Sequence, residues 1–493
     1  MANANVAPAK KTNHWLILIL LAAAQFMVIL DVSIVNVALP SVQKAFSMSQ
    51  TSLQWIITAY TLTFGGFLLL GGRAADLFGR RRTFLAGLTV FALASLADGL
   101  SNSGGMLIAF RTIQGLAGAF MSPAALSIVL VTYRQGHERN VALSVWGAVA
   151  SGGAAVGVLL GGIFTQYLGW RWNFFINVPI GITVLILALR LIDKHESTVE
   201  HNNLDLPGAV LVTGGLMMLV YALVKAPTAG WTSHSSLLYF GIAIVALISF
   251  IFNELRAKHP LIPLSIFRIR NLSGADSLML FMAAGMFSVF FFTTLYLQEI
   301  LGYTPVRTGL SFLVVPFAIA ITATNVPRIV KKIGYRPILM VAPLFVSGGL
   351  FWMSHIPVNG TFWGNVAPGM ILLGLGMGGT FVSASIAATD GVPANEAGLA
   401  SGLLNTAQQI GGSLGLAVLT GIATSSAARY IKNSHVHGAP AHALVNAATV
   451  HGFHDGYLIA STFGIGASLV ATFVIRAQKA KSSVSHGEPA IAA

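Results

Sequence analysis

The feature that most constrains this chain is a succession of long apolar stretches with very few charges. Residues 16–30, within the first stretch, contain no charged side chain. A helix needs about 20 apolar residues to cross a bilayer, and backbone groups in lipid must be hydrogen-bonded within the chain. The stretches are continuous and do not alternate with a period of two, so they predict helices. We expect an all-α integral membrane protein with fourteen transmembrane helices, at about 15–38, 52–71, 83–101, 105–132, 140–165, 173–192, 207–226, 236–254, 273–297, 308–326, 337–354, 362–388, 397–424 and 454–475.

The composition excludes a soluble globular protein. Charged residues make up 9% of the chain and hydrophobic residues 55%, whereas soluble domains carry about 25% charged residues. A net charge of +13 would point to nucleic acid in a soluble protein. Here the basic residues gather in loops, so we expect no nucleic-acid partner. The chain has no cysteine, which excludes disulfides and cysteine-based metal sites, and we expect neither a cofactor nor a metal.

The basic residues alternate from loop to loop. If the N-terminus is cytoplasmic, 21 of the 28 Lys and Arg residues fall in cytoplasmic loops, and Arg111 lies within a segment. Basic residues favour the cytoplasmic side of membrane proteins. No small-residue cleavage site follows the first apolar stretch, so we expect it to stay as a helix rather than to be removed as a signal peptide. We predict a multi-pass membrane protein with both termini in the cytoplasm.

The two halves of the chain resemble each other. Gly72–Arg81 follows the second segment as Val326–Arg336 follows the tenth, and Ala142–Ser144 recurs as Leu399–Ser401, both at an offset of about 255 residues. Such a repeat is typical of transporters whose substrate cavity lies between two six-helix halves. We predict a cytoplasmic tail at 1–14, a six-helix bundle at 15–195, two additional transmembrane helices at 196–260, a second six-helix bundle at 261–476 and a cytoplasmic tail at 477–493.

An acidic residue, Asp31, interrupts the first apolar segment. A charge at that depth costs about 2.5–3.5 kcal/mol on insertion scales, so the side chain faces the protein interior or a water-filled cavity, or it binds a proton. We interpret Asp31 as a proton-binding acid. The alternative is a structural polar contact.

Arg111 is the only basic residue inside a segment, at about the depth of Asp31. An unpaired buried guanidinium is very costly, so we expect polar partners, among them Gln114 one helical turn away. We expect Arg111 to act on proton binding by Asp31, directly or through a polar relay. The alternative is a structural ion pair without a role in transport.

Four stretches of the chain together resemble the fourteen-helix drug:proton antiporters of the major facilitator superfamily, which are multidrug resistance efflux proteins. They are Leu30–Pro40, Gly72–Arg81, Arg111–Gly115 and Arg171–Gly181, and the resemblance covers nearly the whole chain. It implies a major facilitator fold of two six-helix pseudo-repeats plus two extra helices, in a bacterial cytoplasmic membrane. It also implies secondary active efflux of hydrophobic or cationic compounds in exchange for protons, by alternating access.

The loop after the second segment carries the signature of that superfamily, namely Gly72, Asp76, Gly79, Arg80 and Arg81. The glycines permit tight turns, and the carboxylate is favoured near the N-terminus of the next helix. The resemblance implies that this loop latches the two halves together when the cytoplasmic side is closed. The other interpretation is that its positive charge only sets the topology.

The fifth segment contains a frame of small residues that lets helices approach closely, namely Gly153, Gly157, Gly161 and Gly162. The antiporter motif of the resembled family has these glycines but usually a proline where Val158 stands. We therefore expect a proline kink to be missing, without consequence for the fold.

The remaining candidates are polar or aromatic side chains. Asp276 is either a second proton or cation site or a residue at the membrane interface, whereas Asp98, Glu299 and Asp455 lie near outer segment ends, where we expect hydration. The candidates for the substrate cavity are Gln114, Trp55, Tyr60, Asn405, Gln408 and Gln409, with helix–helix contacts as the alternative for the last three. We interpret the last external loop as solvated rather than metal-binding, because its histidines are irregularly spaced: His435, His437, His442, His451 and His454.

The leading prediction is a proton-driven exporter of hydrophobic or cationic drugs, and the runner-up is an exporter dedicated to one metabolite or antibiotic. A membrane-embedded enzyme would need a nucleophile with its base or a set of metal ligands, and the chain has no His-Glu-x-x-His and no P-loop pattern. A receptor without transport is disfavoured by the repeat. The expected partners are a small-molecule substrate, protons and the lipid bilayer; the sequence leaves a periplasmic adaptor open.

Overall fold

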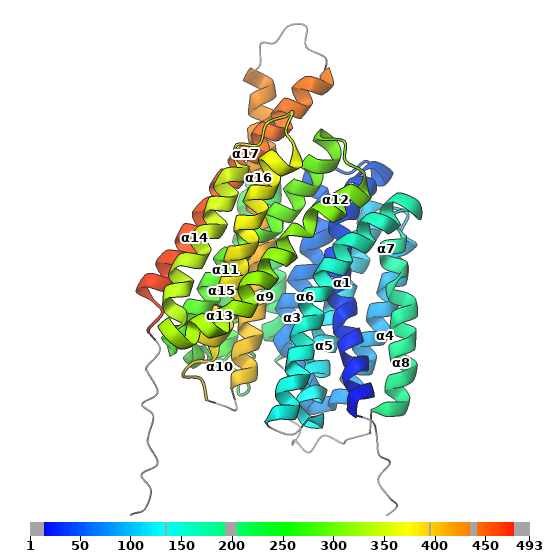
Figure 1. Cartoon of the computed structure of the whole chain (residues 1–493), viewed down its shortest axis with the longest axis vertical. Helices are drawn as coiled ribbons and strands as arrows, with labels where there is room; N and C mark the ends of the chain where they lie inside the picture. Colours follow the sequence, from blue (N-terminus) through cyan, green and yellow to red (C-terminus); the bar gives the residue numbers. More distant parts are fainter. Residues whose placement is uncertain (1–13, 134–135, 193–204, 394–395, 434–440, 478–493) are drawn as a thin grey trace, which may run out of the picture.

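The computed structural model describes residues 14–133, 136–192, 205–393, 396–433 and 441–477, which form a helical bundle without strands (Figure 1). Its first part consists of α1 (His14–Phe46), α2 (Gln50–Leu53), α3 (Trp55–Phe78), α4 (Arg80–Gly99), α5 (Gly104–Thr132), α6 (His137–Tyr167), α7 (Trp172–Phe175) and α8 (Asn177–Leu191). Two helices follow, α9 (Leu206–Ala229) and α10 (His234–Arg256). The last part consists of the 3₁₀ helix η1 (Leu264–Arg268), α11 (Arg270–Leu295), the π-helical turn η2 (Tyr296–Ile300), α12 (Pro305–Phe312), α13 (Val314–Ile333), α14 (Tyr335–Met353), the π-helical turn η3 (Phe362–Val366), α15 (Ala367–Thr389), α16 (Ala397–Asn433) and α17 (Ala441–Phe473).

The long helices follow the apolar segments of the sequence. Thirteen helical spans in the described part of the chain are long and apolar enough to cross a membrane. A further long helix is α4, whose 20 residues begin with three arginines and pack against α5. Each of the fourteen predicted segments thus coincides with helix, and the prediction of an all-α integral membrane protein is confirmed.

Short polar side chains and one glycine mark helix ends. Ser103 Oγ accepts a hydrogen bond from the backbone of Met106 at the start of α5, at 3.2 Å, and Thr304 caps α12 in the same way. Such caps satisfy amide groups that a helix cannot pair internally. Between α3 and α4 the chain turns at Gly79, whose φ of 94° lies in the left-handed region that glycine adopts without steric cost.

Helix α1 begins and helix α17 ends at the same end of the bundle, which is named the terminal end here; the opposite end is the distal end (Figure 1). Helices α16 and α17 extend beyond the others at the distal end. There Ser426 donates a hydrogen bond to Asp455, and the ring centroids of Tyr430 and His451 lie 4.9 Å apart. Because the two long helices support each other, the expectation of a histidine-rich loop is wrong for His442, His451 and His454, which lie in α17, while His435 and His437 lie outside the described residues.

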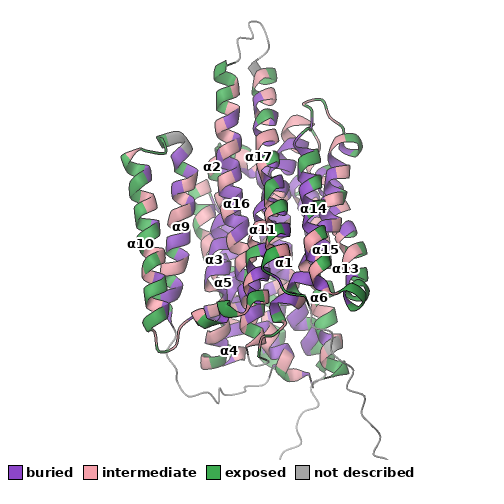
Figure 2. Ribbon diagram, turned by 90° about the vertical axis from the view of Figure 1, so that its left-hand side faces the viewer, coloured by how far each residue is buried: buried purple, intermediate pink, exposed green. Residues whose placement is uncertain are grey.

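Helices α9 and α10 lie at the side of the bundle, where its two halves meet (Figure 2). The halves are α1–α8 and α11–α17. Helix α9 packs on both α3 and α16, with Val220 in one apolar cluster with Leu62 and Ala417. Helix α10 packs on α9 and exposes most of its own surface. The additional pair therefore covers the α3–α16 contact between the two halves.

Hydrogen bonds join the two halves at the distal end. Gln298 Nε2, in η2, donates to the backbone oxygen of Val37 at 2.9 Å. The backbone amide of Val306, in α12, donates to Gln166 Oε1 near the end of α6 at 3.2 Å. These contacts connect the distal parts of α1 and α6 to the second half.

The α3–α16 contact is the second connection between the halves. Thr61 Oγ1 and Ser413 Oγ lie 2.6 Å apart, and Thr406 donates to the backbone oxygen of Gly65 at 3.1 Å. The hydroxyl groups bond across the helices because neighbouring glycines let the backbones approach, a common device in membrane proteins.

Candidate functional site

The carboxylate of Asp31 is the centre of a buried polar cluster in the first half. Its side chain, on α1, is fully buried. Arg111 Nη1, on α5, donates to Oδ2 at 2.5 Å. Gln114 Nε2, one turn along α5, and Asn177 Nδ2, on α8, both donate to Oδ1, at 3.0 and 2.8 Å. A charged carboxylate is tolerated inside an apolar bundle because three donors, one of them the cationic Arg111, surround it.

The guanidinium of Arg111 has the polar partners that its burial requires. Besides the bond to Asp31, it donates to Gln114 Oε1 at 2.5 Å and to the backbone oxygen of Ile56 at 3.2 Å. Its carbon Cζ lies 4.2 Å from the ring centroid of Tyr60 and 5.9 Å from that of Phe174. An arginine over an aromatic face gains electrostatic attraction, and the gain increases when water is excluded.

Asn177 connects Asp31 to two further elements. Its Nδ2 atom also lies 3.0 Å from Ser95 Oγ on α4, and Ser95 in turn donates to the backbone oxygen of Phe174 in α7 at 2.9 Å. Sequence reasoning missed the role of Asn177, although this residue lies in the Arg171–Gly181 stretch. The available signal was an amide side chain at the start of an otherwise apolar helix.

The structure corrects the expectation that Asp98 is hydrated. Its side chain, on α4, is fully buried, and neither carboxylate oxygen has a hydrogen-bond partner among the described residues. Asp98 interacts electrostatically with Arg111 and Asp31. The expectation is wrong because the short helix α7 packs against α4, with Phe175 in contact with the position of Gly99, and shields this end of the helix from water.

The other predicted acids lie apart from this cluster. Asp276, on α11 in the second half, is 8% exposed, and neither of its oxygens has a hydrogen-bond partner among the described residues. Glu299 and Asp455 are half-buried. The structure therefore does not bring Asp276 together with Asp31 and Arg111 in one site.

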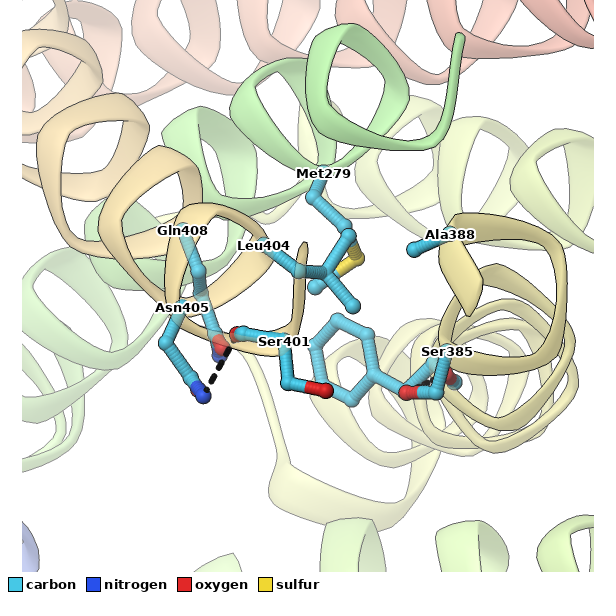
Figure 3. Close-up of a pocket in the computed structure, with 8 residues that line it drawn as sticks. Met279, Ser385, Ala388, Ser401, Leu404, Asn405 and Gln408 are labelled. Carbon is cyan, nitrogen blue, oxygen red and sulfur yellow. Dashed lines mark hydrogen bonds between the residues drawn. The ribbon is translucent and has the colours of Figure 1, made fainter. Parts of the chain in front are cut away.

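A cavity of about 180 Å³ lies in the second half near the terminal end, between α11, α15 and α16 (Figure 3). Two of the six residues predicted for the substrate cavity, Asn405 and Gln408, line it together with Met279, Phe381, Ser385, Ala388, Ser401 and Leu404. Asn405 Nδ2 donates to the backbone oxygen of Ser401 at 3.1 Å. The lining groups are apolar, hydroxyl or amide, and none is charged.

The other four predicted cavity residues lie elsewhere. Gln409 faces α3, where its Cβ is 2.6 Å from the site of a Cβ on Gly65. The ring of Trp55 packs against Tyr221 of α9, with centroids 6.3 Å apart. Tyr60 and Gln114 belong to the Arg111 cluster. These four residues therefore lie outside the cavity that Asn405 and Gln408 line, because the helices turn their polar faces in different directions. Their contact with a substrate stays a prediction.

The loop signature differs in part from the expectation. Gly79 makes the tight turn, but Gly72 lies inside α3, so the prediction of a turn there is wrong. Asp76 does not cap α4; instead Arg80 Nη2 lies 3.6 Å from its Oδ1 in an exposed ion pair. Arg81 Nη2 donates to the backbone oxygen of Leu189 at 2.9 Å, in the same half. In this arrangement the Arg80–Asp76 ion pair and the Arg81–Leu189 hydrogen bond both lie within the first half.

The four glycines of the fifth segment are sites of close approach. A Cβ on Gly153 would lie 3.2 Å from Ile29, and one on Gly157 would lie 2.7 Å from Ser33, both on α1. A Cβ on Gly161 or on Gly162 would lie 2.6 Å from a backbone oxygen, that of Ile34 or of Pro305 respectively. Helix α6 continues without interruption through Val158, as expected without the proline.

The sequence contains Gly-x-Ser-x-Gly at Gly411–Gly415, the spacing of a hydrolase nucleophile turn. That chemistry needs the serine exposed on a sharp turn between a strand and a helix. Here Ser413 lies within α16, is buried, and donates to the backbone oxygen of Gln409 at 2.8 Å. Its hydroxyl group is also hydrogen-bonded to that of Thr61, across the contact between the two halves. Among the described residues there is also no group of three His, Cys, Asp or Glu side chains that could hold a metal ion.

Comparison with known proteins assigns the family. Residues 21–416 match the family model described as Major Facilitator Superfamily. The chain belongs to this superfamily. It is 39% identical over 460 residues to the puromycin resistance protein pur8 of Streptomyces alboniger, covering 93% of this chain and 90% of that protein. It is 38% identical over 416 residues to the cephamycin export protein CmcT of Amycolatopsis lactamdurans, covering 83% and 85%.

Solved structures of major facilitator proteins share the fold. The POT family transporter PepTSo aligns with a TM-score of 0.66 at 14% sequence identity, covering 92% of this chain and 98% of that one. The predicted major facilitator fold is therefore confirmed. The predicted resemblance of the sequence to antibiotic resistance and export proteins is confirmed as well.

Proposed function

We propose that this major facilitator protein exports small, largely apolar antibiotic-like compounds in exchange for protons that bind at Asp31. The observation that carries the proposal is a carboxylate held inside an apolar half-bundle by donors from two other helices. The relatives named for puromycin resistance and cephamycin export support this class of compound.

Proton binding at Asp31 changes how three helices hold one another. The ionised carboxylate neutralises Arg111 and accepts hydrogen bonds from α5 and α8. A proton on Asp31 leaves Arg111 as a buried cation without its counterion, which is costly. The two protonation states therefore favour different packing of α1, and this difference couples proton movement to alternating access.

The cavity at the terminal end is the proposed binding site for the exported compound. Asn405 and Gln408 offer amide groups, and Met279 with Phe381 offers an adaptable apolar wall. Pockets for drug-sized ligands measure about 300–1,000 Å³, so a cavity of about 180 Å³ holds only part of such a molecule. We expect the rest of the compound to lie toward the first half.

An exporter dedicated to a single antibiotic is the second candidate. It is favoured by the two relatives described above, which are each named for one compound. The uncharged cavity lining suits either function. Transport of a panel of compounds separates the two, because a dedicated exporter moves one of them and a multidrug exporter moves several.

We also propose that the terminal end faces the cytoplasm and that the loop signature closes it. The distribution of Lys and Arg among the loops supports this orientation. Asp76, Arg80 and Arg81 lie at the terminal end, and their ion pair and hydrogen bond are within the first half. The cavity lies at the same end. When that end closes, these residues meet the second half and hold it.

Purified protein in liposomes tests the proposal. With an acidic vesicle interior, the wild type should accumulate ethidium or radiolabelled puromycin as protons leave. Asp31→Asn should reduce gradient-driven uptake by about 100-fold, the lower end of what a positioned proton-transferring side chain contributes. Glu138→Gln is the matched control, because Glu138 is an exposed acid at the start of α6, and uptake should stay at the wild-type rate.

Ethidium binding to detergent-solubilised Asp31→Asn protein shows whether the substrate site is intact. Retained binding with lost uptake supports Asp31 as the proton site. Equal gradient-driven uptake by the wild type and Asp31→Asn would overturn it and direct attention to Asp276. Uptake of puromycin without uptake of ethidium or of other cationic dyes would favour the dedicated exporter.

A further inference from the structure

Asp98 is a buried acid that the proposed mechanism does not use. Its side chain is fully buried, and neither oxygen has a hydrogen-bond partner among the described residues. An ionised carboxylate in apolar surroundings without hydrogen bonds is among the costliest groups in a protein. Asp98 therefore carries its proton in this arrangement, while Asp31 accepts hydrogen bonds from three donors, one of which is the cationic Arg111.

The two acids share one cation. Asp98 lies one turn after Ser95 on α4, and Ser95 Oγ accepts a hydrogen bond from the Asn177 amide that also donates to Asp31. Its electrostatic interactions are with Arg111 from α5, Asp31 from α1 and Tyr60 from α3. With Arg111 protonated and Tyr60 neutral, one ionised acid makes the cluster neutral, and two would leave a buried net negative charge. One proton shared between Asp31 and Asp98 therefore keeps this buried cluster neutral.

Asp98 is the acid nearer the distal end. It is the penultimate residue of α4, which runs from the terminal end to the distal end, whereas Asp31 lies near the middle of α1. Other buried polar atoms without hydrogen-bond partners occur on the distal parts of the same half: both amide atoms of Gln54, Thr58 Oγ1 and Asn173 Oδ1. Buried polar atoms are usually satisfied by protein or by ordered water. The distal part of this half-bundle therefore contains further buried polar groups besides Asp98.

We propose that Asp98 is a second proton-binding residue, which passes protons from the solution at the distal end to Asp31. The inference rests on the proposed antiport. In the step, the carboxyl group of Asp98 gives its proton to the carboxylate of Asp31, and Arg111 stays protonated but shifts its charge pairing from Asp31 to Asp98. The ionised Asp98 then takes a replacement proton from the distal solution, and the proton on Asp31 leaves on the terminal side after the halves have moved.

Transport by Asp98→Asn, which keeps the shape but cannot carry a proton, tests this role. Ethidium exchange in liposomes without a pH gradient reports substrate binding and alternating access, and it should stay at the wild-type rate. Gradient-driven ethidium uptake should fall by about 100-fold. Its dependence on pH at the distal side should also shift relative to the wild type. Asp98→Glu, which restores the acid, should recover uptake, and Glu138→Gln should match the wild type in every assay.

Infrared difference spectroscopy gives an independent measurement of the proton. The wild type should show the carbonyl band of a buried protonated carboxyl group, and this band should disappear in Asp98→Asn and move in Asp98→Glu. If Asp98→Asn does not fold, comparison of the wild type with Asp98→Glu still tests the proposal. A carbonyl band at the same position in both proteins would contradict a protonated Asp98.

The outcomes separate the two proposals. A wild type that exchanges ethidium but shows no response to the pH gradient overturns the antiport and this inference with it. A wild type that responds, together with Asp98→Asn that keeps the same rate and pH dependence, overturns only the role of Asp98. Loss of exchange as well as uptake in a folded Asp98→Asn protein assigns Asp98 to structure and likewise overturns the role in proton transfer.

Discussion

Asn177 Nδ2 lies 2.8 Å from Asp31 Oδ1, and this amide joins the helix that carries the buried acid to the last helix of the same half. The same nitrogen lies 3.0 Å from Ser95 Oγ on α4. One side chain thus connects α1, α4 and α8 around Asp31. A change in the charge of Asp31 therefore alters its hydrogen bond with Asn177 as well as its ion pair with Arg111, and both changes affect how these helices pack.

Replacement of Asn177 by alanine should weaken both folding and coupling. The substitution removes one of the three donors to the Asp31 carboxylate and the amide that donates to Ser95 Oγ, and the loss of buried hydrogen bonds of this kind costs about 1–3 kcal/mol. We expect a lower thermal midpoint for Asn177→Ala in detergent and slower gradient-driven ethidium uptake. Thr183→Ala is the matched control, because Thr183 is exposed on the same helix and bonds only the backbone of Pro179. An unchanged midpoint and rate in Asn177→Ala would contradict this function of the amide.

Larger side chains at Gly157 should separate α6 from α1. A Cβ there lies 2.7 Å from Ser33 Cβ and 3.1 Å from the backbone oxygen of Leu30, beside Asp31. Overpacking in a close helix contact costs about 1–3 kcal/mol. We expect Gly157→Val to lower the thermal midpoint and the transport rate. Gly152→Ala on the same helix is the control, since a Cβ there meets nothing within 4 Å, and it should be neutral or stabilising.

The start of α9 should lose stability at low pH through Asp205. Burial raises the pKa of Asp205, but hydrogen bonds from the backbone of Gly208, from Asn253 and from the backbone of Leu261 outweigh it and hold the pKa below its usual value. The pKa of Asp205 is lower in the folded state than in the unfolded state, where it is about 3.9, so the ionised carboxylate stabilises the folded protein at pH values above about 3.9. This stabilisation is lost as the pH falls through the folded-state pKa.

Asp205→Ala removes this contribution together with the helix cap, which is worth about 1 kcal/mol. The thermal midpoint of Asp205→Ala should lie below that of the wild type at pH 7, and the difference should shrink below about pH 4. Asp205→Asn keeps a capping oxygen, so it should lie between the two at pH 7. A difference that stays constant from pH 7 to pH 3 would show that the charge of Asp205 has no part in it.

The sequence predicted the helices and the centre of the polar cluster for the same physical reason. A charged residue in an apolar segment has few possible partners, so Asp31, Arg111 and Gln114 were expected to lie near one another, and they do. Asn177 was missed because a neutral amide near a helix start has many ordinary functions. Its contact with Asp31 depends on how α8 packs on α1.

Other parts of the site depend on tertiary packing that the sequence does not contain. Asp98 was expected at a hydrated helix end, but α7 covers it. Gln408 and Gln409 are adjacent in sequence, yet one lines the cavity and the other faces α3, because neighbouring residues on a helix point about 100° apart. The rotation of α16 about its own axis therefore decides whether Gln408 or Gln409 is available to a ligand.

The absence of cysteine from the chain allows a direct test of which end of the bundle is open. Asn405 lines the cavity and is exposed, so Asn405→Cys should react with a water-soluble maleimide from the terminal side. Gln166 and Val306 hold the halves together at the distal end, and a cysteine pair at these positions should be joined by a short bifunctional maleimide. In whole cells, where the reagent stays outside, we expect Asn405→Cys to remain unlabelled, and in inverted membrane vesicles it should be labelled. The reverse pattern would place the terminal end outside the cell and contradict cytoplasmic termini. The cross-linked Gln166→Cys, Val306→Cys protein should bind ethidium from the terminal side but lose uptake, because the distal end can no longer open.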